Sequence, residues 1–190
     1  MRVHAMKDSP FRLAATLTLV CAASAALVAL VGRVTAGPVA EAQSRARAQS
    51  LLRVLPAGSP EPVERAALAP DGSTNFTYWA AGGAVAMEAV SERGYAGRIR
   101  LLVGFDADGR LHGFQVLEHA ETPGLGAKLA DAQNAVLDSA RGRPAAGTDW
   151  RVRKDGGEID AITAATISSR AACDALAQAA ARLASLHDAP

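Results

Sequence analysis

Aromatic and cysteine side chains are scarce in this sequence of 190 residues, and neither sign of charge dominates it. Aromatic residues make up 4 % of the chain, and 20 basic against 19 acidic residues leave a formal net charge of +1. Because the sequence has no basic stripe and no aromatic ladder, nucleic acid is not expected as a partner. The two cysteines, Cys21 and Cys173, lie in an apolar N-terminal run and near the far end, so no internal disulfide framework is expected.

Hydrophobic residues make up 49 % of the chain, enough for the core of one ordinary domain with a short additional segment. Alanine is abundant, which favours helices that pack through small side chains. No internal repeat or long low-complexity tract interrupts the sequence.

The longest apolar run lies between Arg12 and Arg33, where 20 successive residues carry no charge. A helix of this length spans roughly 30 Å, the thickness of a bilayer core. Arg2, Lys7 and Arg12 precede it, which predicts a cytoplasmic N-terminus and an exported C-terminal part. The alternative is a cleaved signal peptide ending near residues 34–36, although the apolar core of a signal peptide usually has only about 7–15 residues.

These observations divide the chain into four parts. Residues 1–12 are expected in the cytoplasm, and residues 13–32 are expected to form the transmembrane helix of a single-pass protein. Residues 33–82 are expected to be a helical linker leading into the folded part. Residues 83–190 are expected to form one exported domain.

Apolar residues with a period of two predict strands in the middle of the chain. Ile99, Leu101 and Val103 alternate with other residues as a strand requires, and glycine-bearing links on both sides suit hairpin turns. The expected elements are a helix at 38–55, a short strand at 76–79, and an antiparallel meander of strands at 85–92, 98–105 and 110–118.

The last third is expected to hold two helices and two extended stretches. Its final helix has an apolar stripe spaced three and four residues apart that includes Cys173 and Leu176. Cys173 is therefore interpreted as a small buried hydrophobe and not as a reactive thiol. The expected fold class is α+β with an antiparallel sheet and flanking helices, the later elements being a helix at 127–141, strands at 150–154 and 159–163, and a helix at 167–186.

The segment from Asp160 to Arg170 combines small residues with hydroxyls at an expected strand-to-helix junction. A helix N-terminus offers unpaired amide N–H groups and the positive end of the helix dipole, which together favour a phosphate. Thr166 would hold its hydroxyl among these donors, with Arg170 one turn further along. The alternative is an ordinary capped helix, in which Thr166 or Ser168 only satisfies amide groups.

This segment resembles the flavinylation motif of covalent FMN-binding domains: a Ser or Thr, then Gly, Ala, Thr, any residue, and Ser or Thr. Thr163, Ala165, Thr166 and Ser168 match it. The resemblance implies that Thr166 bears FMN through a phosphoester. Ala164 departs from the motif, because it stands where the family commonly has glycine, a residue with more backbone freedom.

A second motif, the stretch HAETPGLG at 119–126, resembles a loop of the Rnf complex G subunit and of its counterpart, the C subunit of sodium-pumping NADH:quinone reductase. The stretches at 94–97, 103–106 and 154–157 and the early membrane helix fit the same family, so the resemblance covers nearly the whole chain. It implies that this loop lies close to the flavin, which carries over to Glu121, Thr122, Leu125 and Gly126.

Other residues in and near this loop can be interpreted as structural or solvated, with no contact to a ligand. Pro123 and Gly124 are expected to fix a tight turn, and Gly124 is as suited to that turn as to flavin contact. His119 could ligate a metal, but no second cluster of ligands accompanies it, so no metal site is expected. Lys128 is expected either to face the phosphate or to be solvated.

The resemblance implies an electron-transfer subunit of a membrane complex that moves electrons between ferredoxin and NAD and couples this to ion transport. It also implies a bacterial inner membrane, with residues 83–190 as an FMN-binding domain in the periplasm. FMN is the expected cofactor and no catalytic side chains are expected, because the flavin carries the electron chemistry. The expected partners are integral-membrane and iron–sulfur subunits, and a flavin transferase for maturation. Two alternatives remain: a stand-alone exported flavoprotein electron donor, and a non-redox membrane-anchored scaffold.

Overall fold

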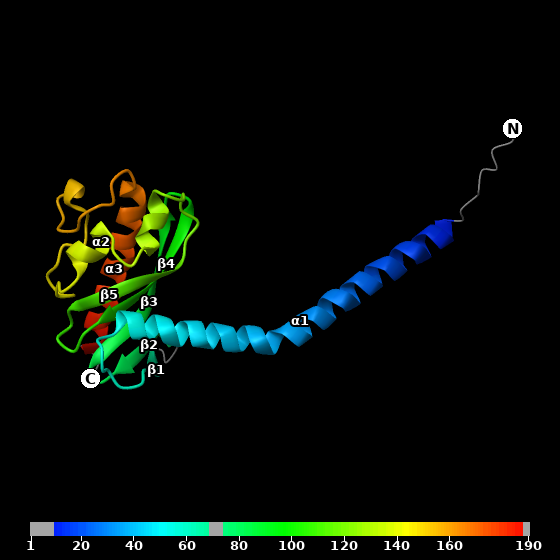
Figure 1. Cartoon of the computed structure of the whole chain (residues 1–190), viewed down its shortest axis with the longest axis horizontal. Coiled ribbons are helices and arrows are strands. Elements are labelled where there is room, and N and C mark those ends of the chain that lie inside the picture. Colours follow the sequence, from blue (N-terminus) through cyan, green and yellow to red (C-terminus); the bar gives the residue numbers. More distant parts are fainter. Residues whose placement is uncertain (1–9, 69–73, 188–190) are drawn as a thin grey trace. The chain divides into compact units, whose positions relative to one another are not determined.

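The computed structural model describes residues 10–68 and 74–187 (Figure 1). Most of the expected cytoplasmic segment 1–12, including Arg2 and Lys7, lies outside the described residues. Contacts divide the chain into two compact units, Met1–Arg47 and Ala48–Pro190. The second unit therefore includes residues 48–82, which the sequence placed in the linker.

Five strands form one antiparallel sheet whose spatial order follows the sequence (Figure 1). The meander predicted at 85–118 is confirmed, and the short strand predicted at 76–79 is part of a longer one. The first strand was not predicted, because its residues 63–66 are all exposed and show no apolar alternation. The strands are β1 (Val63–Leu68), β2 (Thr74–Ala81), β3 (Ala84–Gly94), β4 (Gly97–Phe105) and β5 (Leu111–Glu118).

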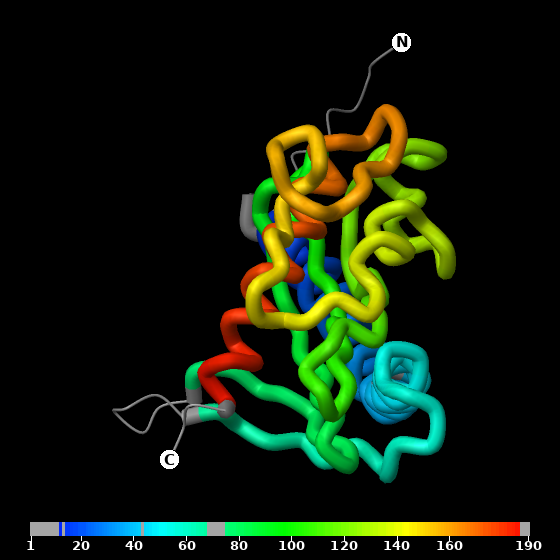
Figure 2. Tube along the Cα trace, turned by 90° about the vertical axis from the view of Figure 1, so that its left-hand side faces the viewer, coloured from blue at the N-terminus to red at the C-terminus, as the bar shows by residue number. Residues whose placement is uncertain are grey.

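The main core lies between the sheet and the last helix, α3 (Thr166–His187). Figure 2 shows α3, in orange to red, running alongside the green strands. Ile99, Leu101 and Val103 of β4 are fully buried there, together with the predicted stripe of α3, Cys173, Leu176, Ala180 and Leu183. A second cluster covers the other face of the sheet, where Leu51, Val54 and Leu55 meet Trp79 and Leu102.

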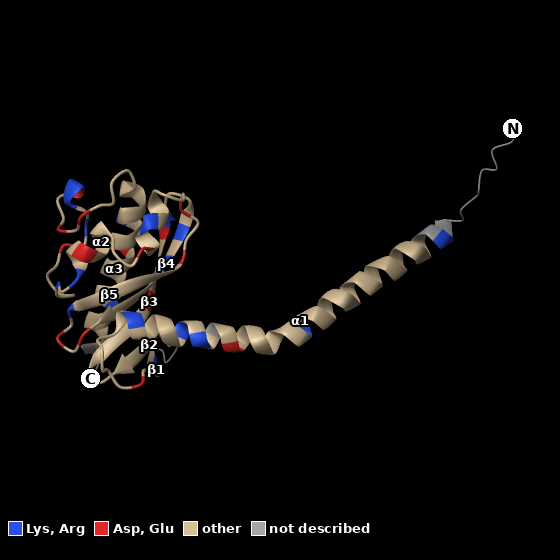
Figure 3. Ribbon diagram, in the orientation of Figure 1, with Lys and Arg blue, Asp and Glu red and all other residues tan. Residues whose placement is uncertain are grey.

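The N-terminal helix α1 (Pro10–Val54) is continuous over 45 residues. It is long and apolar enough to cross a membrane, and none of its most apolar window is buried in the protein. Figure 3 shows the long stretch of α1 that carries no charged side chain. The sequence instead predicted separate helices at 13–32 and 38–55. Pro38 lies inside α1, where a proline removes one backbone hydrogen bond without necessarily ending the helix.

The single helix predicted at 127–141 is wrong. The chain forms a short 3₁₀ helix, η1 (Gly126–Ala130), and a separate α2 (Ala135–Ala140). The buried Asn134 separates them: its side-chain oxygen accepts the Leu137 N–H at 3.0 Å, and its side-chain amide donates to Leu129 O at 3.2 Å. An N-cap of this kind begins a new helix and prevents a continuous one.

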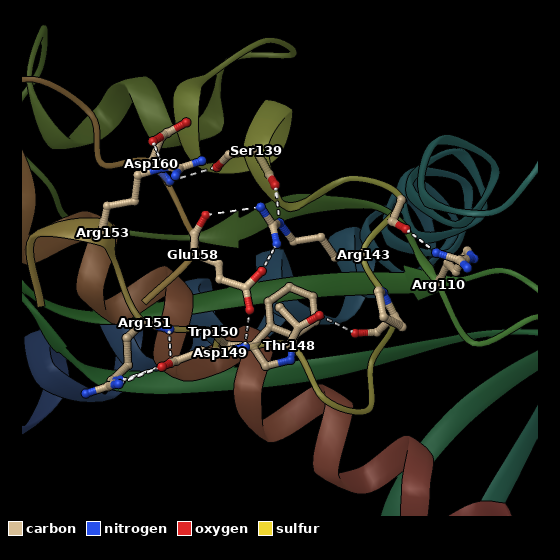
Figure 4. Close-up of polar contacts among 12 residues, drawn as sticks. Arg110, Ser139, Arg143, Thr148, Asp149, Trp150, Arg151, Arg153, Glu158 and Asp160 are labelled. Atoms are coloured by element: carbon tan, nitrogen blue, oxygen red, sulfur yellow. Dashed lines mark hydrogen bonds and ion pairs between the residues drawn. The ribbon is translucent and has the colours of Figure 1, made fainter. Parts of the chain in front are cut away.

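The strands predicted at 150–154 and 159–163 are also wrong. Within the described chain, this region has only one parallel bridge, between Val152 and Ile159, and a 3₁₀ turn, η2 (Arg153–Asp155). Ion pairs hold its irregular backbone in place, as Figure 4 shows for Arg143–Glu158, Arg151–Asp149 and Arg153–Asp160. This segment leads directly into α3.

Candidate functional site

A cleft of about 290 Å³ opens where α3 begins. Three segments meet there: the β3–β4 hairpin, the loop before η1, and the turn before α3. The cleft brings together seven of the eight residues predicted from the sequence, and Thr163 is the exception, because its exposed side chain does not line the cleft. The lining residues are Tyr95, Glu121, Thr122, Leu125, Gly126, Ala164, Ala165, Thr166, Ile167 and Ser168.

The loop before η1 is a tight turn, as predicted. The Leu125 N–H donates to Thr122 O at 3.2 Å, with Pro123 and Gly124 between them. Gly124 has φ +76°, which a type II turn requires at this position and which glycine adopts without strain. Gly124 does not line the cleft, so its place in the fold is explained by the turn. Leu125, the next residue, exposes 43 % of its surface.

Glu121 is the one charged residue buried in the cleft wall, with 4 % of its surface exposed. One carboxylate oxygen accepts the Ala96 N–H at 3.0 Å, and the other accepts the Ser168 hydroxyl. Gly126 packs so closely that a Cβ there would lie 2.5 Å from Glu121 Oε2 and 2.4 Å from Ser168 Oγ. Glu121 therefore ties the hairpin, its own loop and the first turn of α3 together.

The chain enters α3 through a second tight turn, Ile162–Ala165, closed by the Ala165 N–H donating to Ile162 O at 3.0 Å. Its third residue, Ala164, has φ +62° and is the only non-glycine residue of the described chain with positive φ. This conformation costs an alanine about 1–2 kcal/mol. The positive φ thus gives a physical reason for the glycine that the flavinylation motif commonly has at this position.

Ser169 supports this turn, and sequence reasoning missed it. It is fully buried; its hydroxyl accepts the Ile162 N–H at 2.9 Å and donates to Ala165 O at 2.9 Å. Each such bond contributes about 0.5–1.5 kcal/mol, which offsets the strain at Ala164. Its position just beyond the recognised motif gave no signal, because its partners come from the three-dimensional turn.

The first turn of α3 has the features of an anion-binding site. The first hydrogen bond of the helix is from Ser169 N–H to Ala165 O at 3.0 Å, so the helix itself offers no carbonyl to the amide groups of residues 166–168. Thr166 is half-buried at this end and lines the cleft. Free amides and the positive end of the dipole suit a phosphate oxygen beside its hydroxyl.

No lysine or arginine is among the residues that line the cleft. Arg170, which lies one turn beyond Thr166, donates to Asp155 at 2.7 and 2.6 Å and holds the pKa of that carboxyl below its usual value. Lys128 is exposed and does not line the cleft. The helix amides are therefore the positive groups available to an anion in this cleft.

Three apolar side chains surround the cleft and remain open to solvent. Tyr95, Leu125 and Ile167 are exposed by 69 %, 43 % and 45 %. Tyr95 and Ile167 were not predicted as site residues: Tyr95 lies in a hairpin turn, and Ile167 is the unspecified position of the motif. An apolar border next to an anion-binding helix end suits a ligand with a flat ring and a phosphate, which is the chemistry of FMN.

The structure gives no support for metal binding by His119 or for a reactive thiol at Cys173. His119 accepts the Glu121 N–H at its Nδ1, 3.2 Å away, and within the described residues no group of three His, Cys, Asp or Glu side chains could hold a metal. Cys173 is 3 % exposed, and burial raises the pKa of its thiol to about 12. A small buried hydrophobe, as predicted, describes Cys173 well.

The comparisons with known proteins agree with this chemistry. A family model described as FMN-binding domain matches residues 94–181. The chain is similar to the G subunit of the ion-translocating oxidoreductase complex of Pseudomonas aeruginosa, with 35 % identity over 190 residues, 92 % of this chain and 89 % of the relative. The protein of the same description from Cereibacter sphaeroides is 35 % identical over 177 residues, 87 % of this chain and 80 % of the relative. The protein of the same description from Escherichia coli K12 is 42 % identical over 99 residues, which cover 50 % of this chain and 48 % of the relative.

Proposed function

The chain belongs to the family of the G subunits of ion-translocating oxidoreductase complexes, and on this premise we propose that it passes electrons within such a complex through one FMN in the cleft before α3. One observation carries the proposal. Residues from two separate motifs, among them Glu121, Leu125 and Thr166, line a single cleft, although up to 45 positions separate them in the sequence. That cleft lies within the FMN-binding domain.

We further propose that the FMN is covalent, its phosphate esterified to Thr166. The cleft has no basic side chain among its lining residues, so an ion pair would not retain a free nucleotide there. A phosphoester to a threonine at the helix N-terminus needs no such cation, because the amides of residues 166–168 stabilise the remaining negative charge. A separate flavin transferase that uses magnesium would make this bond from FAD: the Thr166 hydroxyl oxygen would attack the phosphorus of the FMN half, the pyrophosphate bond would break, and AMP would leave.

The bound FMN would supply the electron chemistry, and the protein supplies binding and orientation. Tyr95, Leu125 and Ile167 would cover apolar ring surface and exclude water from it. Glu121 would fix the relative positions of the hairpin, its own loop and the helix that bears Thr166. No side chain of the cleft is needed as a nucleophile or a general base in electron transfer.

Residues 13–32 would anchor the protein in a bacterial inner membrane with its domain in the periplasm. The basic residues before them, Arg2, Lys7 and Arg12, support this orientation. A covalent cofactor fits such a location, because no pool of FMN would refill an empty site there. Integral-membrane and iron–sulfur subunits would pass electrons to and from it, between ferredoxin and NAD.

The test compares three full-length chains produced with an active flavin transferase: wild type, Thr166→Ala and Thr163→Ala. Wild type and Thr163→Ala should keep flavin fluorescence through denaturing electrophoresis, whereas Thr166→Ala should lose it. Fluorescence retained in Thr166→Ala would place the attachment elsewhere, and its absence from wild type would favour the non-redox scaffold.

A second measurement separates a component of a complex from a stand-alone electron donor. Membranes that contain the whole complex should transfer electrons from ferredoxin to NAD, and Thr166→Ala should abolish this while Thr166→Ser restores part of it. Equal rates in wild-type and Thr166→Ala membranes, with fast turnover of the purified chain on small acceptors, would contradict a role within the complex.

A further inference from the structure

Two tight turns contribute residues to the cleft. Each requires a positive φ at its third residue, but the residue type at that position differs. In the turn Thr122–Leu125, the third residue is Gly124, and in the turn Ile162–Ala165 it is Ala164. Both have positive φ, +76° and +62°. Glycine adopts this conformation freely, but alanine does not, so only the second turn needs outside support.

Ser169 provides that support from one turn inside α3. Its hydroxyl spans the turn, since it accepts the N–H of Ile162, the first residue, and donates to the carbonyl of Ala165, the last. Both Ser169 and the neighbouring Ser168 are buried, but the Ser168 hydroxyl donates to Glu121. The two adjacent serines therefore have separate partners.

We propose that Ser169 is a positioning residue for flavin attachment, which rests on the proposed attachment of FMN to Thr166. By bracing the turn with Ala164 in its left-handed conformation, it fixes the point at which α3 begins. Thr166 and the free amides of residues 166–168 are thereby held toward the cleft. Without the brace, Ala164 relaxes toward negative φ, and the attachment hydroxyl is presented to the transferase only part of the time.

The chain offers a matched control in Ser139. Its hydroxyl also accepts a backbone N–H, that of Asp160 at 2.8 Å, and donates to a helix carbonyl, Ala135 O at 2.7 Å, as Figure 4 shows for Ser139 and Asp160. Ser139 is not among the residues that line the cleft. Ser169→Ala and Ser139→Ala thus remove similar bonds, but only Ser169→Ala removes the brace of the turn that precedes Thr166.

The experiment measures the initial rate of flavin incorporation into the full-length apo-proteins by purified transferase, FAD and magnesium, well below every melting temperature. Ser169→Ala should be slower by about tenfold or more, the factor expected when two hydrogen bonds no longer hold the competent conformation. Ser139→Ala should match wild type. Adding Ala164→Gly to Ser169→Ala should restore most of the rate, because glycine needs no brace.

Hydrogen exchange of the apo-proteins provides a readout that does not depend on flavin. Ser169→Ala should accelerate exchange in the peptide that contains Ile162, and Ser139→Ala should not. If Ser169→Ala incorporates flavin as fast as wild type, or if Ser139→Ala slows incorporation equally, the role of Ser169 is overturned while Thr166 remains the attachment site. A wild-type chain that takes no flavin on Thr166 would instead contradict the proposed function itself, and the role of Ser169 with it.

Discussion

Backbone conformation distinguishes single residues at this site more sharply than side-chain chemistry does. Ala164 is a small apolar residue, yet its φ of +62° places it under strain that a glycine would not have. Ser169 is a common residue type in a helix, yet it is fully buried and bonded to both ends of the strained turn. Such positions are recognised from geometry, because their residue types alone are ordinary.

Replacing Ala164 by glycine should stabilise the protein. Relief of about 1–2 kcal/mol of left-handed strain exceeds the entropy that a glycine adds to the unfolded chain, about 0.4–1 kcal/mol, so the free energy of unfolding should rise by about 0.5–1 kcal/mol. Urea unfolding measures this change. The same substitution at the exposed Ala177 inside α3 should lower stability by about 1 kcal/mol. A loss of stability in Ala164→Gly would contradict the strain.

Replacing Gly126 by alanine should destabilise the cleft. A Cβ there would lie 2.4 Å from Ser168 Oγ and 2.5 Å from Glu121 Oε2, and overpacking of this kind costs about 1–3 kcal/mol. The control is Gly113→Ala, because a Cβ at Gly113 meets nothing within 4 Å. Thermal unfolding of both variants checks the prediction, which fails if Gly126→Ala melts no lower than Gly113→Ala.

Among the elements, the break between η1 and α2 depends on one buried side chain. Asn134 makes a cap bond to Leu137 and donates to Leu129 O and Asp131 O. Asn134→Ala should lower the free energy of unfolding by about 2 kcal/mol or more, since it removes an N-cap and leaves carbonyls unpaired. Asn134→Asp keeps the cap acceptor, so its free energy of unfolding should lie between those of wild type and Asn134→Ala. An Asn134→Ala variant within about 0.5 kcal/mol of wild type, the range of a neutral surface change, would be the contrary result.

The junction between η2 and α3 should weaken in acid. Arg170 lowers the pKa of Asp155 below 3.8, the value expected in the unfolded chain. A carboxyl with a lowered pKa in the folded state stabilises the protein above the unfolded pKa and loses that effect as the pH falls through the folded one. Wild type should therefore be more stable than Asp155→Asn at pH 7, and the difference should shrink below about pH 4. A difference that does not change between pH 7 and pH 2.5 would contradict this explanation.

The regular elements could be predicted from the sequence because their burial follows a simple period. Ile99, Leu101 and Val103 alternate along a strand with one face on the core, and the stripe of Cys173 and Leu176 follows a helix. The segments at 127–141 and 150–163 could not, since a side-chain cap and ion pairs between distant residues determine them. Contacts of that kind leave no periodic trace.

The candidate site was predictable to the extent that it is encoded in two short motifs. Glu121 and Thr166 were identified from such stretches, and the structure places both in one cleft. Tyr95 and Ser169 were missed for different reasons: the first is an exposed residue of a hairpin turn, and the second acts through the backbone of another segment. Arg170, which lies one turn beyond Thr166, does not line the cleft, because Asp155 engages its guanidinium.

At the scale of the whole molecule, an apolar N-terminal helix is joined to a domain that we propose holds one flavin by a covalent bond. The mixed charges of the chain, with a net charge of +1, and the lack of a basic residue lining the cleft both argue against retention of FMN by electrostatics alone. The proposed function therefore depends mainly on the proposed covalent bond at Thr166.

Mass spectrometry of the full-length chain, extracted from membranes of cells with an active flavin transferase, tests that bond most directly. We predict that the peptide containing Thr166 is heavier than its sequence mass by one FMN less one water, with fragment ions that place the addition on Thr166. An unmodified peptide, or an addition on Thr163 or Ser168, would contradict the proposed attachment.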